Sequence, residues 1–115
     1  MRKINTLKKN YEFKNVIKKG QFFVRKHIII YLTKNNKNKN IIGIAINTKL
    51  CNAVKRNRIK RLIRESFYKE EKFLKEGYNI VFLWNKKEPA ENFDFQTINE
   101  EMREIFKDAG LFKEN

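Results

Sequence analysis

The chain is organised around the stretch Asn52-Ala53-Val54-Lys55-Arg56-Asn57-Arg58-Ile59-Lys60-Arg61-Leu62-Ile63-Arg64-Glu65-Ser66-Phe67. Six of the ten residues from Lys55 to Arg64 are cationic, and none is acidic. Mostly apolar residues recur at helical spacing through the same stretch, at Ile59, Leu62, Ile63, Ser66 and Phe67. On the opposite side of such a helix lie Asn57, Lys60, Arg61 and Arg64. The pattern predicts a helix that packs on a core through one face and offers the other face to a polyanion.

Two features of this helix are unfavourable unless an anion binds it. Arg56 and Lys60, and also Lys60 and Arg64, lie four residues apart, and each like-charged pair costs roughly 0.2–0.5 kcal/mol. Asn52 is a predicted N-cap, yet three cations follow it within six residues, where the helix dipole favours anions. A charged helix face is usually only solvated, but these two costs favour a binding role here.

The charge of the whole chain supports the same interpretation. The net charge is +14 over 115 residues, with one acid and 19 Lys and Arg in residues 1–64. Residues 65–115 contain 12 acids and 8 Lys and Arg, so the two halves have opposite signs. This distribution suits a nucleic-acid partner and, less well, an anionic membrane surface.

We expect a single RNA-binding domain over residues 1–115, with residues 1–8 as a basic, flexible tail. No apolar run approaches the roughly 20 residues that a membrane span needs, so no membrane partner is expected. The basic N-terminus leads into no hydrophobic signal core. The single cysteine, Cys51, cannot form an internal disulfide and fits a cytoplasmic location.

The first half of the chain predicts a helix followed by two strands. Asn10 is a predicted cap for a helix over Tyr11–Lys18, which Gly20 ends. Phe22–Thr33 is rich in aromatic and β-branched residues and predicts one strand, and Ile41–Asn47 predicts a second. Because only a polar turn separates the two strands, we expect them to pair as an antiparallel hairpin.

The second half predicts one more strand and one more helix after the basic helix. Tyr78–Trp84 is almost continuously apolar, which favours a central position in the sheet. Asp94 is a predicted cap for a final helix that ends at Gly110, with a core face of Phe95, Ile98, Met102, Ile105 and Ala109. The predicted fold class is therefore α+β, with one single-layer small sheet covered by helices in the order α-β-β-α-β-α.

The basic helix also contains a recognisable family motif. Its residues Asn52-Ala53-Val54-x-Arg56-Asn57-Arg58-x-Lys60-Arg61-x-x-Arg64 closely resemble the Arg-Asn-Arg signature of the bacterial ribonuclease P protein subunit. The resemblance extends from Leu7 to Leu111 and implies the family's left-handed β-α-β crossover. It also implies that one set of side chains faces the catalytic RNA, namely Asn52, Arg56, Asn57, Arg58, Lys60, Arg61 and Arg64.

The same resemblance implies a second site, a cleft for the single-stranded 5′ leader of precursor tRNA. In the family, a Phe-x-x-x-Phe pattern on the first helix and a Tyr on the long strand line this cleft. Phe13 and Tyr31 match the pattern, whereas Ile17 replaces the second Phe and supplies only an apolar surface. From the residues alone, an aromatic and an aliphatic residue four apart on a helix more often belong to a core.

The stretch before the basic helix matches the family only in part. Gly43-Ile44-Ala45-Ile46-Asn47-Thr48-Lys49 resembles the family pattern Gly-Leu-Ser-Val-Ser-Lys-Lys. Lys49 is kept and is expected to contact the leader. Thr48 replaces a lysine and Cys51 stands where the family usually has glycine, so a cation is lost and the loop has less backbone freedom.

The residues predict no catalytic site in the polypeptide. His27 is the only histidine, which excludes paired-histidine nuclease chemistry and a Cys/His zinc cluster. Beside Arg25 and Lys26, it is expected to be a strand residue or an RNA contact. The resemblance implies that the RNA subunit and its bound Mg²⁺ perform the hydrolysis, and that the protein alone binds no cofactor.

Two alternatives to this function follow from the same features. A ribosomal protein of the same fold, bound to rRNA, would share the charge but would not need the Arg-Asn-Arg signature. A DNA-binding transcription factor would need a helix-turn-helix pair, whereas this basic helix lies between predicted strands. The expected partners are therefore the catalytic ribonuclease P RNA and precursor tRNA, with no DNA.

Overall fold

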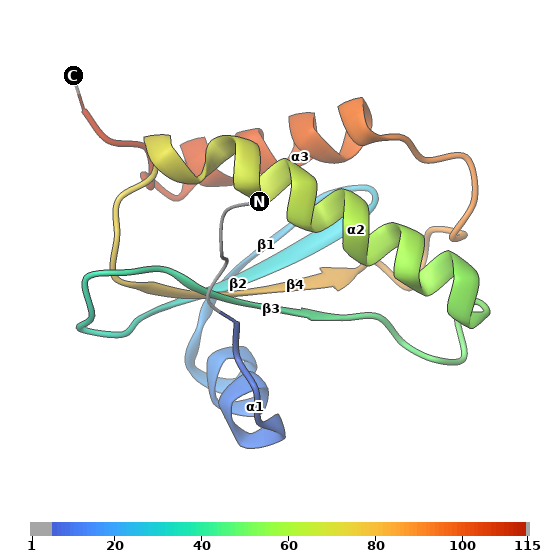
Figure 1. The fold of residues 1–115 in the computed structure, drawn as a ribbon, viewed down its shortest axis with the longest axis horizontal. Helices are drawn as coiled ribbons and strands as arrows, with labels where there is room; N and C mark the ends of the chain where they lie inside the picture. Colours follow the sequence, from blue (N-terminus) through green and yellow to red (C-terminus); the bar gives the residue numbers. More distant parts are fainter. Residues whose placement is uncertain (1–5, 115) are drawn as a thin grey trace.

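The computed structural model describes residues 6–114 and shows one twisted sheet with helices on both faces (Figure 1). Two long helices cover one face and a short helix covers part of the other. The elements in chain order are α1 (Asn10–Lys19), β1 (Gln21–Val24), β2 (Ile28–Lys34), β3 (Ile41–Ala45), α2 (Ala53–Glu70), the 3₁₀ turn η1 (Glu71–Phe73), β4 (Tyr78–Trp84) and α3 (Phe95–Asp108). The predicted α+β class is confirmed.

The strand order in the sheet is β1-β2-β4-β3, so β4 has a neighbour on each side. It pairs antiparallel with β2 and parallel with β3, and Ile80, Val81 and Phe82 are fully buried. The predicted central position of Tyr78–Trp84 is therefore confirmed. A strand with apolar side chains on both faces must be covered on both faces, and only the middle of the sheet provides that cover.

The predicted hairpin between residues 22–33 and 41–47 is wrong, because β4 lies between β2 and β3. The polar turn that joins them is bonded to the start of β4 instead. The Asn35 N–H donates to the Gly77 carbonyl (2.9 Å), and the Tyr78 N–H donates to Asn40 Oδ1 (2.9 Å). The short polar turn would allow β2 and β3 to pair with each other. The apolar β4 must be covered on both faces, so it takes the position between them.

The predicted strand over residues 22–33 is instead two strands joined by a tight turn. β1 pairs antiparallel with β2, with Phe22 opposite Tyr31 and Val24 opposite Ile29. The Arg25 N–H donates to the Ile28 carbonyl across the turn (2.9 Å). β1 and β2 together correspond to the one strand predicted over residues 22–33. When they are counted as one, the predicted order α-β-β-α-β-α is confirmed.

The helix starts agree with the sequence at two of three places. The Lys55 N–H donates to Asn52 Oδ1 (2.9 Å) at α2, and the Thr97 N–H donates to Asp94 Oδ1 (2.8 Å) at α3. The hydrogen bond from Thr97 lowers the pKa of Asp94. The predicted Asn10 cap is wrong, because α1 begins at Asn10 itself and Glu12 Oε1 accepts the Lys9 N–H one residue earlier (3.0 Å).

The predicted tail differs from the structure in its last residues. Residues 1–5 lie outside the described part of the chain. Thr6 pairs in parallel with Ile42, and the N–H of buried Leu7 donates to the Ile42 carbonyl (2.8 Å). Thr6 and Leu7 therefore extend the sheet beyond β3 and are not part of a free tail.

α2 joins the parallel strands β3 and β4 and crosses above the sheet between them (Figure 1). The crossover is left-handed, as the resemblance implied, although about 98% of such connections are right-handed. α3 lies beside α2 on the same face, and α1 lies on the opposite face. The basic helix is thus placed between two strands, which differs from a helix-turn-helix pair.

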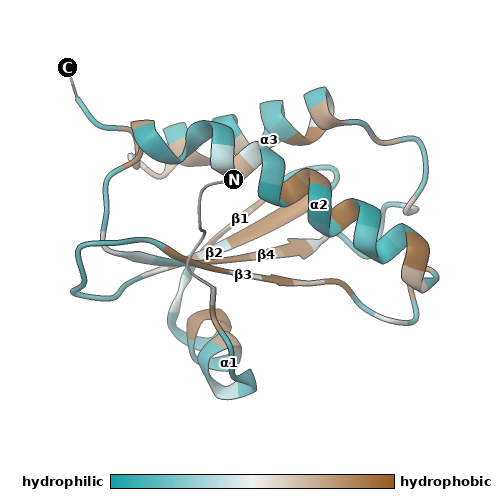
Figure 2. Ribbon diagram, in the orientation of Figure 1, coloured by the Kyte–Doolittle hydropathy of each residue, from teal (hydrophilic) through white to brown (hydrophobic). Residues whose placement is uncertain are grey.

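The main core lies between the sheet and the pair α2 and α3, where the apolar sides of these elements face inward (Figure 2). Phe67 of α2, Phe82 of β4 and Phe106 of α3 contact one another edge to face, with ring centroids 6.0–6.5 Å apart. The predicted apolar stripe of α2 faces this core. Leu62 is only half-buried, and the other members are buried, namely Ile59, Ile63, Ser66 and Phe67.

A buried polar network fixes α2 against α3. Asn99 Nδ2 donates to Ser66 Oγ (2.8 Å) and to Glu70 Oε2 (3.1 Å). The other oxygen of Glu70 lies 3.5 Å from Arg103 Nε. Because these buried groups must keep their partners, α2 cannot rotate or slide without a cost, and the direction of its basic face is fixed.

His27 is buried at the turn between β1 and β2, so the prediction that it contacts RNA is wrong and it is a structural residue. Its Nδ1 lies 2.5 Å from Glu101 Oε2, and its ring meets Trp84 edge-on at 5.6 Å. Glu101 Oε1 also accepts the N–H groups of His27 (2.9 Å) and Ile28 (3.2 Å). One carboxylate from α3 therefore holds the turn that divides the two strands.

Glu101→Ala removes the acceptor from two backbone N–H groups and from the His27 ring. A buried donor left without a partner costs about 1–3 kcal/mol. We expect the free energy of unfolding, measured by urea titration, to fall by at least about 1 kcal/mol. The control is Glu100→Ala on the exposed side of α3, which should stay within about 0.5 kcal/mol of the parent protein. Equal losses in the two variants would contradict the role given to Glu101.

Candidate RNA interface

The outer face of α2 is a cationic surface. Burial of its apolar stripe leaves Asn57, Arg58, Arg61 and Arg64 exposed and Lys60 half-buried. The first acid along the helix is Glu65, so no carboxylate of α2 precedes these cations. Guanidinium groups on one rigid helix can each bind a phosphate, and their like charges favour an anion at that place.

Three cations near the start of α2 have partners within the protein, and two of them, Arg56 and Arg58, belong to the signature. Arg56 Nη1 donates to the carbonyl of Cys51 (2.7 Å) and lies 3.3 Å from the carbonyl of Thr48, so it holds the β3–α2 loop. Arg58 lies over the ring of Phe93 at 5.2 Å. Lys55 forms an exposed ion pair with Glu91 (3.2 Å). Arg56 thus has a structural role that the sequence did not predict.

A second candidate surface lies on the α1 face of the sheet. Phe13 and Tyr31 are both half-buried against one small cluster, formed by Leu7, Val16 and Val81. The Phe13 ring lies directly on Gly43, where a Cβ would stand 2.6 Å from two of its carbons. The structure therefore brings together two of the four residues predicted for the leader cleft. Both keep part of their rings exposed.

The other two predicted leader residues lie apart from that cluster. Ile17 is on α1 with 37% of its surface exposed, and it is not among the residues packed on Leu7, Val16 and Val81. Lys49 is exposed in the loop between β3 and α2.

One open hollow joins the two candidate surfaces. It has a volume of about 170 Å³ at the outer edge of β3, and its lining includes Phe13 of α1, Gly43 of β3 and Arg64 of α2. The remaining lining residues are Thr6, Leu7, Ile42 and Ile44. A polyanion bound along α2 could thus continue past Arg64 onto the aromatic residues of the other face.

Phe22 of β1 is a further exposed aromatic residue, for which the sequence predicted no role. Its side chain is 60% exposed and contacts Tyr31 on the neighbouring strand, with ring centroids 5.6 Å apart and planes 32° apart. The pair Phe22-Phe23 in a strand was a usable signal, because neighbouring strand residues point to opposite faces. Which of the two rings is exposed depended on the pairing of β1, which the sequence did not predict.

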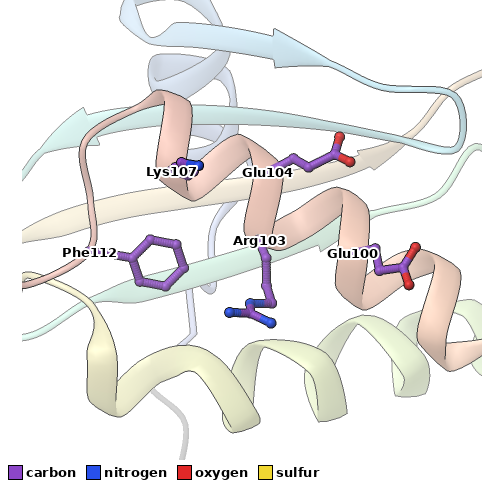
Figure 3. Close-up of a pocket in the computed structure, with 5 residues that line it drawn as sticks. All are labelled: Glu100, Arg103, Glu104, Lys107 and Phe112. Carbon is purple, nitrogen blue, oxygen red and sulfur yellow. The ribbon is translucent and has the colours of Figure 1, made fainter.

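The 12 acids of residues 65–115 are spread over several elements, and four of them lie on α3. Glu104 and Asp108 both bind Arg25, with 3.0 Å between Arg25 Nε and Glu104 Oε1. Burial lowers the pKa of Arg25, but the hydrogen bonds and charges of the two carboxylates raise it by more. A hollow of about 290 Å³ beside α3 is lined by charges of both signs and by one aromatic ring, at Glu100, Arg103, Glu104, Lys107 and Phe112 (Figure 3). This side suits a polyanion less well than α2.

The structure also bears on two other classes of site. Among residues 6–114, no group of three or more His, Cys, Asp or Glu side chains is placed to hold a metal ion. None of the helices in the described part of the chain combines the length and apolar character of a membrane span.

The fold and these surfaces define a small α+β protein with a cationic face on one helix. The sequence family described as ribonuclease P matches residues 1–110. The chain belongs to the bacterial ribonuclease P protein family, and it is therefore a protein component of this tRNA-processing ribonucleoprotein.

Relatives and solved structures agree with this assignment. The ribonuclease P protein component of Clostridium kluyveri is 38% identical over 109 residues, which is 93% of this chain and 96% of that protein. The Staphylococcus aureus RNase P protein superposes with a TM-score of 0.83 at 29% identity, covering 96% of this chain and all of the other. The Thermotoga maritima RNase P protein superposes with a TM-score of 0.80 at 27% identity, covering 93% of this chain and 97% of the other. These matches decide against a ribosomal protein.

Gly43→Ala should disturb the α1 face, because the new methyl group would overlap the Phe13 ring. Overpacking of this kind costs about 1–3 kcal/mol, and we expect that loss in the free energy of unfolding measured with urea. In a Phe13→Ala background the obstructing ring is absent, so most of the cost of Gly43→Ala should disappear. Additive effects of the two substitutions would show that Phe13 does not rest on Gly43.

Proposed function

We propose that the two surfaces have separate tasks within ribonuclease P. The cationic face of α2 binds the RNA subunit near the leader junction, and the α1 face holds the single-stranded 5′ leader of precursor tRNA. The observation on which this division depends is the hollow that Phe13 and Arg64 share at the edge of β3. The hollow makes the two surfaces continuous. A leader that leaves the catalytic RNA and enters a cleft on the protein requires such a continuous surface.

The exposure of the signature residues supports the first task. Asn57, Arg61 and Arg64 are exposed on one face, and the buried network of Ser66, Asn99 and Glu70 fixes the direction of that face. Rigid cations neutralise phosphates without further ordering of the backbone. Association with ribonuclease P RNA follows from membership of the family, whereas the assignment of these residues to that contact is the proposal.

The chemistry of the α1 face supports the second task. Single-stranded nucleic acid is bound by aromatic side chains on which bases stack, together with cations that follow the backbone. Phe13 and Tyr31 supply rings with exposed edges or faces, and Arg64 supplies a cation beside them. Ile17 adds an exposed apolar surface, and Lys49 adds a second cation from the β3–α2 loop.

Catalysis is proposed to belong to the RNA subunit, with Mg²⁺ held there rather than by the protein. The only histidine of the chain is buried against Glu101 and Trp84 and is not available as a general base. Glu91 forms an exposed ion pair with Lys55 in the first turn of α2. The contribution of the protein is then to bind and orient the leader.

Reconstitution tests this division directly. Purified protein should leave precursor tRNA intact, and the protein combined with a bacterial ribonuclease P RNA should cleave it at low Mg²⁺ concentration. The RNA alone, at the same Mg²⁺ concentration, is the control. Specific cleavage by protein that has been freed of RNA with nuclease would contradict the proposal.

Arg61→Ala should weaken RNA binding without unfolding the protein. Surface substitutions usually change stability by less than about 0.5 kcal/mol. Removal of one phosphate contact should lower the slope of log affinity against log salt by about one unit. We expect the same two results for Arg64→Ala. Filter binding measures the RNA affinity and its salt dependence, and thermal melting measures the stability.

Arg56→Ala is the matched comparison, because the same residue type on the same helix holds the carbonyls of Thr48 and Cys51. This variant should lower the melting temperature as well as the RNA affinity. If Arg61→Ala and Arg64→Ala lower the melting temperature as much as Arg56→Ala does, the direction given to the α2 face is wrong.

Tyr31→Ala should affect leader-bearing substrate selectively. Stacking of a base on an aromatic ring contributes roughly 1–3 kcal/mol. In the reconstituted holoenzyme, affinity for precursor tRNA should fall while affinity for mature tRNA, which has no leader, should not change. Tyr31→Phe keeps the ring and should behave like the parent protein. An unchanged ratio of the two affinities in a folded Tyr31→Ala variant would make Tyr31 a core residue only.

A further inference from the structure

Phe22 is an unusually exposed ring for a residue in a sheet. Its neighbour Phe23 packs against the main core, so Phe22 points to the opposite face, where α1 lies. β1 is an edge strand, and among residues 6–114 no further strand pairs with its outer side. A single exposed apolar side chain needs no explanation by itself. Its position relative to the other aromatic residues of this face is what suggests a role.

The strand register places Phe22 at the end of a row that crosses the whole sheet. Phe22 is opposite Tyr31, Tyr31 is opposite Val81, and Val81 is opposite Gly43. Directly paired residues point to the same face, so all four positions lie on the α1 face. Since the Phe13 ring rests on Gly43, aromatic rings stand at both ends of the row.

The length of this row fits a short single strand. Adjacent strands lie about 4.8 Å apart, so Gly43 and Phe22 are separated by about 14 Å. Other RNA-binding proteins with four-stranded sheets stack two or three bases on aromatic residues of one sheet face. Val81 in the middle of the row is buried, and the aromatic residues that keep some exposure along it are Phe13, Tyr31 and Phe22.

The electrostatic surroundings of Phe22 favour a nucleic-acid strand over an acidic or purely apolar partner. Lys18 and Lys19 are exposed in the last turn of α1, directly before β1. No acid occurs between residues 13 and 64, so β1 and β2 lack carboxylates, and the one acid of α1, Glu12, lies in its first turn at the end away from β1. The acids that bind Arg25 belong to α3 on the other face of the sheet.

We propose that Phe22, together with Tyr31, forms an additional base-stacking subsite for the 5′ leader at the β1 edge. The inference rests on the proposed function, in which the leader enters from the α2 side past Arg64 and Phe13. The β1 edge is the far end of that path, so the subsite binds leader nucleotides farther from the cleavage position. It supplies an aromatic surface in a chain whose α1 has Ile17 in place of a second Phe.

The substitution that tests this subsite is Phe22→Leu, which keeps an apolar side chain on Tyr31 but removes the aromatic face. Holoenzyme reconstituted with a bacterial ribonuclease P RNA is titrated with precursor tRNAs whose leaders are lengthened one nucleotide at a time, and with mature tRNA. We expect Phe22→Leu to weaken binding of long-leader precursors roughly 5-fold or more. Binding of mature tRNA and of the shortest leaders should not change, and Phe22→Trp should keep the parent affinity.

Phe73→Leu is the matched control, because Phe73 is also an exposed phenylalanine (52%) but lies on η1 beyond α2. It should leave the dependence on leader length unchanged. A 2-aminopurine placed in the far part of the leader gives a second measurement, since stacking quenches its fluorescence. Quenching should be present with the parent protein and with Phe22→Trp and should be reduced with Phe22→Leu.

The outcomes separate this inference from the function on which it rests. If Tyr31→Ala changes the precursor-to-mature ratio and Phe22→Leu changes neither binding nor quenching, the leader cleft exists and the β1 subsite does not. If neither substitution has an effect, the leader cleft itself is refuted, and the subsite with it. Loss of binding at all leader lengths in Phe22→Leu would also overturn the subsite, because it would indicate a general defect in assembly.

Discussion

The structure depends on the burial of one side of α2 between the sheet and α3. Ile59, Ile63 and Phe67 enter the main core, and the hydrogen bonds of Ser66 and Glu70 with Asn99 fix the helix about its own axis. A helix with several arginines and few acids would repel itself and bind anions in many orientations if it were free. Held in this way, it presents its cations in a single direction. The specificity of the surface therefore originates in the core.

Charge is separated in space as well as along the chain. Of the 27 Lys and Arg, 19 precede residue 65, whereas 12 of the 13 acids lie at residue 65 or beyond, and four of these lie on α3. Several of those acids have structural tasks: Glu101 holds the His27 turn, and Glu104 and Asp108 hold Arg25. These carboxylates neutralise and fix the β1–β2 turn without lowering the positive potential of α2. The protein keeps a large net charge while its acids stabilise the fold away from the RNA face.

The prediction from sequence was most successful where the physical cause is local. The spacing of apolar residues identified α2 and its buried stripe, and the side chains of Asn52 and Asp94 marked two helix starts. The composition of Tyr78–Trp84 identified a central strand, and the signature residues identified the family. Each of these depends on residues that are close in the chain. The strand order was mispredicted because a turn of polar residues does not determine which strand comes between its two ends.

The sequence by itself determined a basic amphipathic helix, an α+β class and membership of the ribonuclease P protein family. The tertiary structure alone decided which residues share a surface. It put β4 between β2 and β3, turned Arg56 toward the carbonyls of its own loop, and buried His27 against Glu101. It also aligned Phe22 and Tyr31 with Gly43, on which Phe13 rests. Strand register and side-chain partners are set by burial of residues far apart in the chain, and periodicity along the sequence contains no record of those contacts.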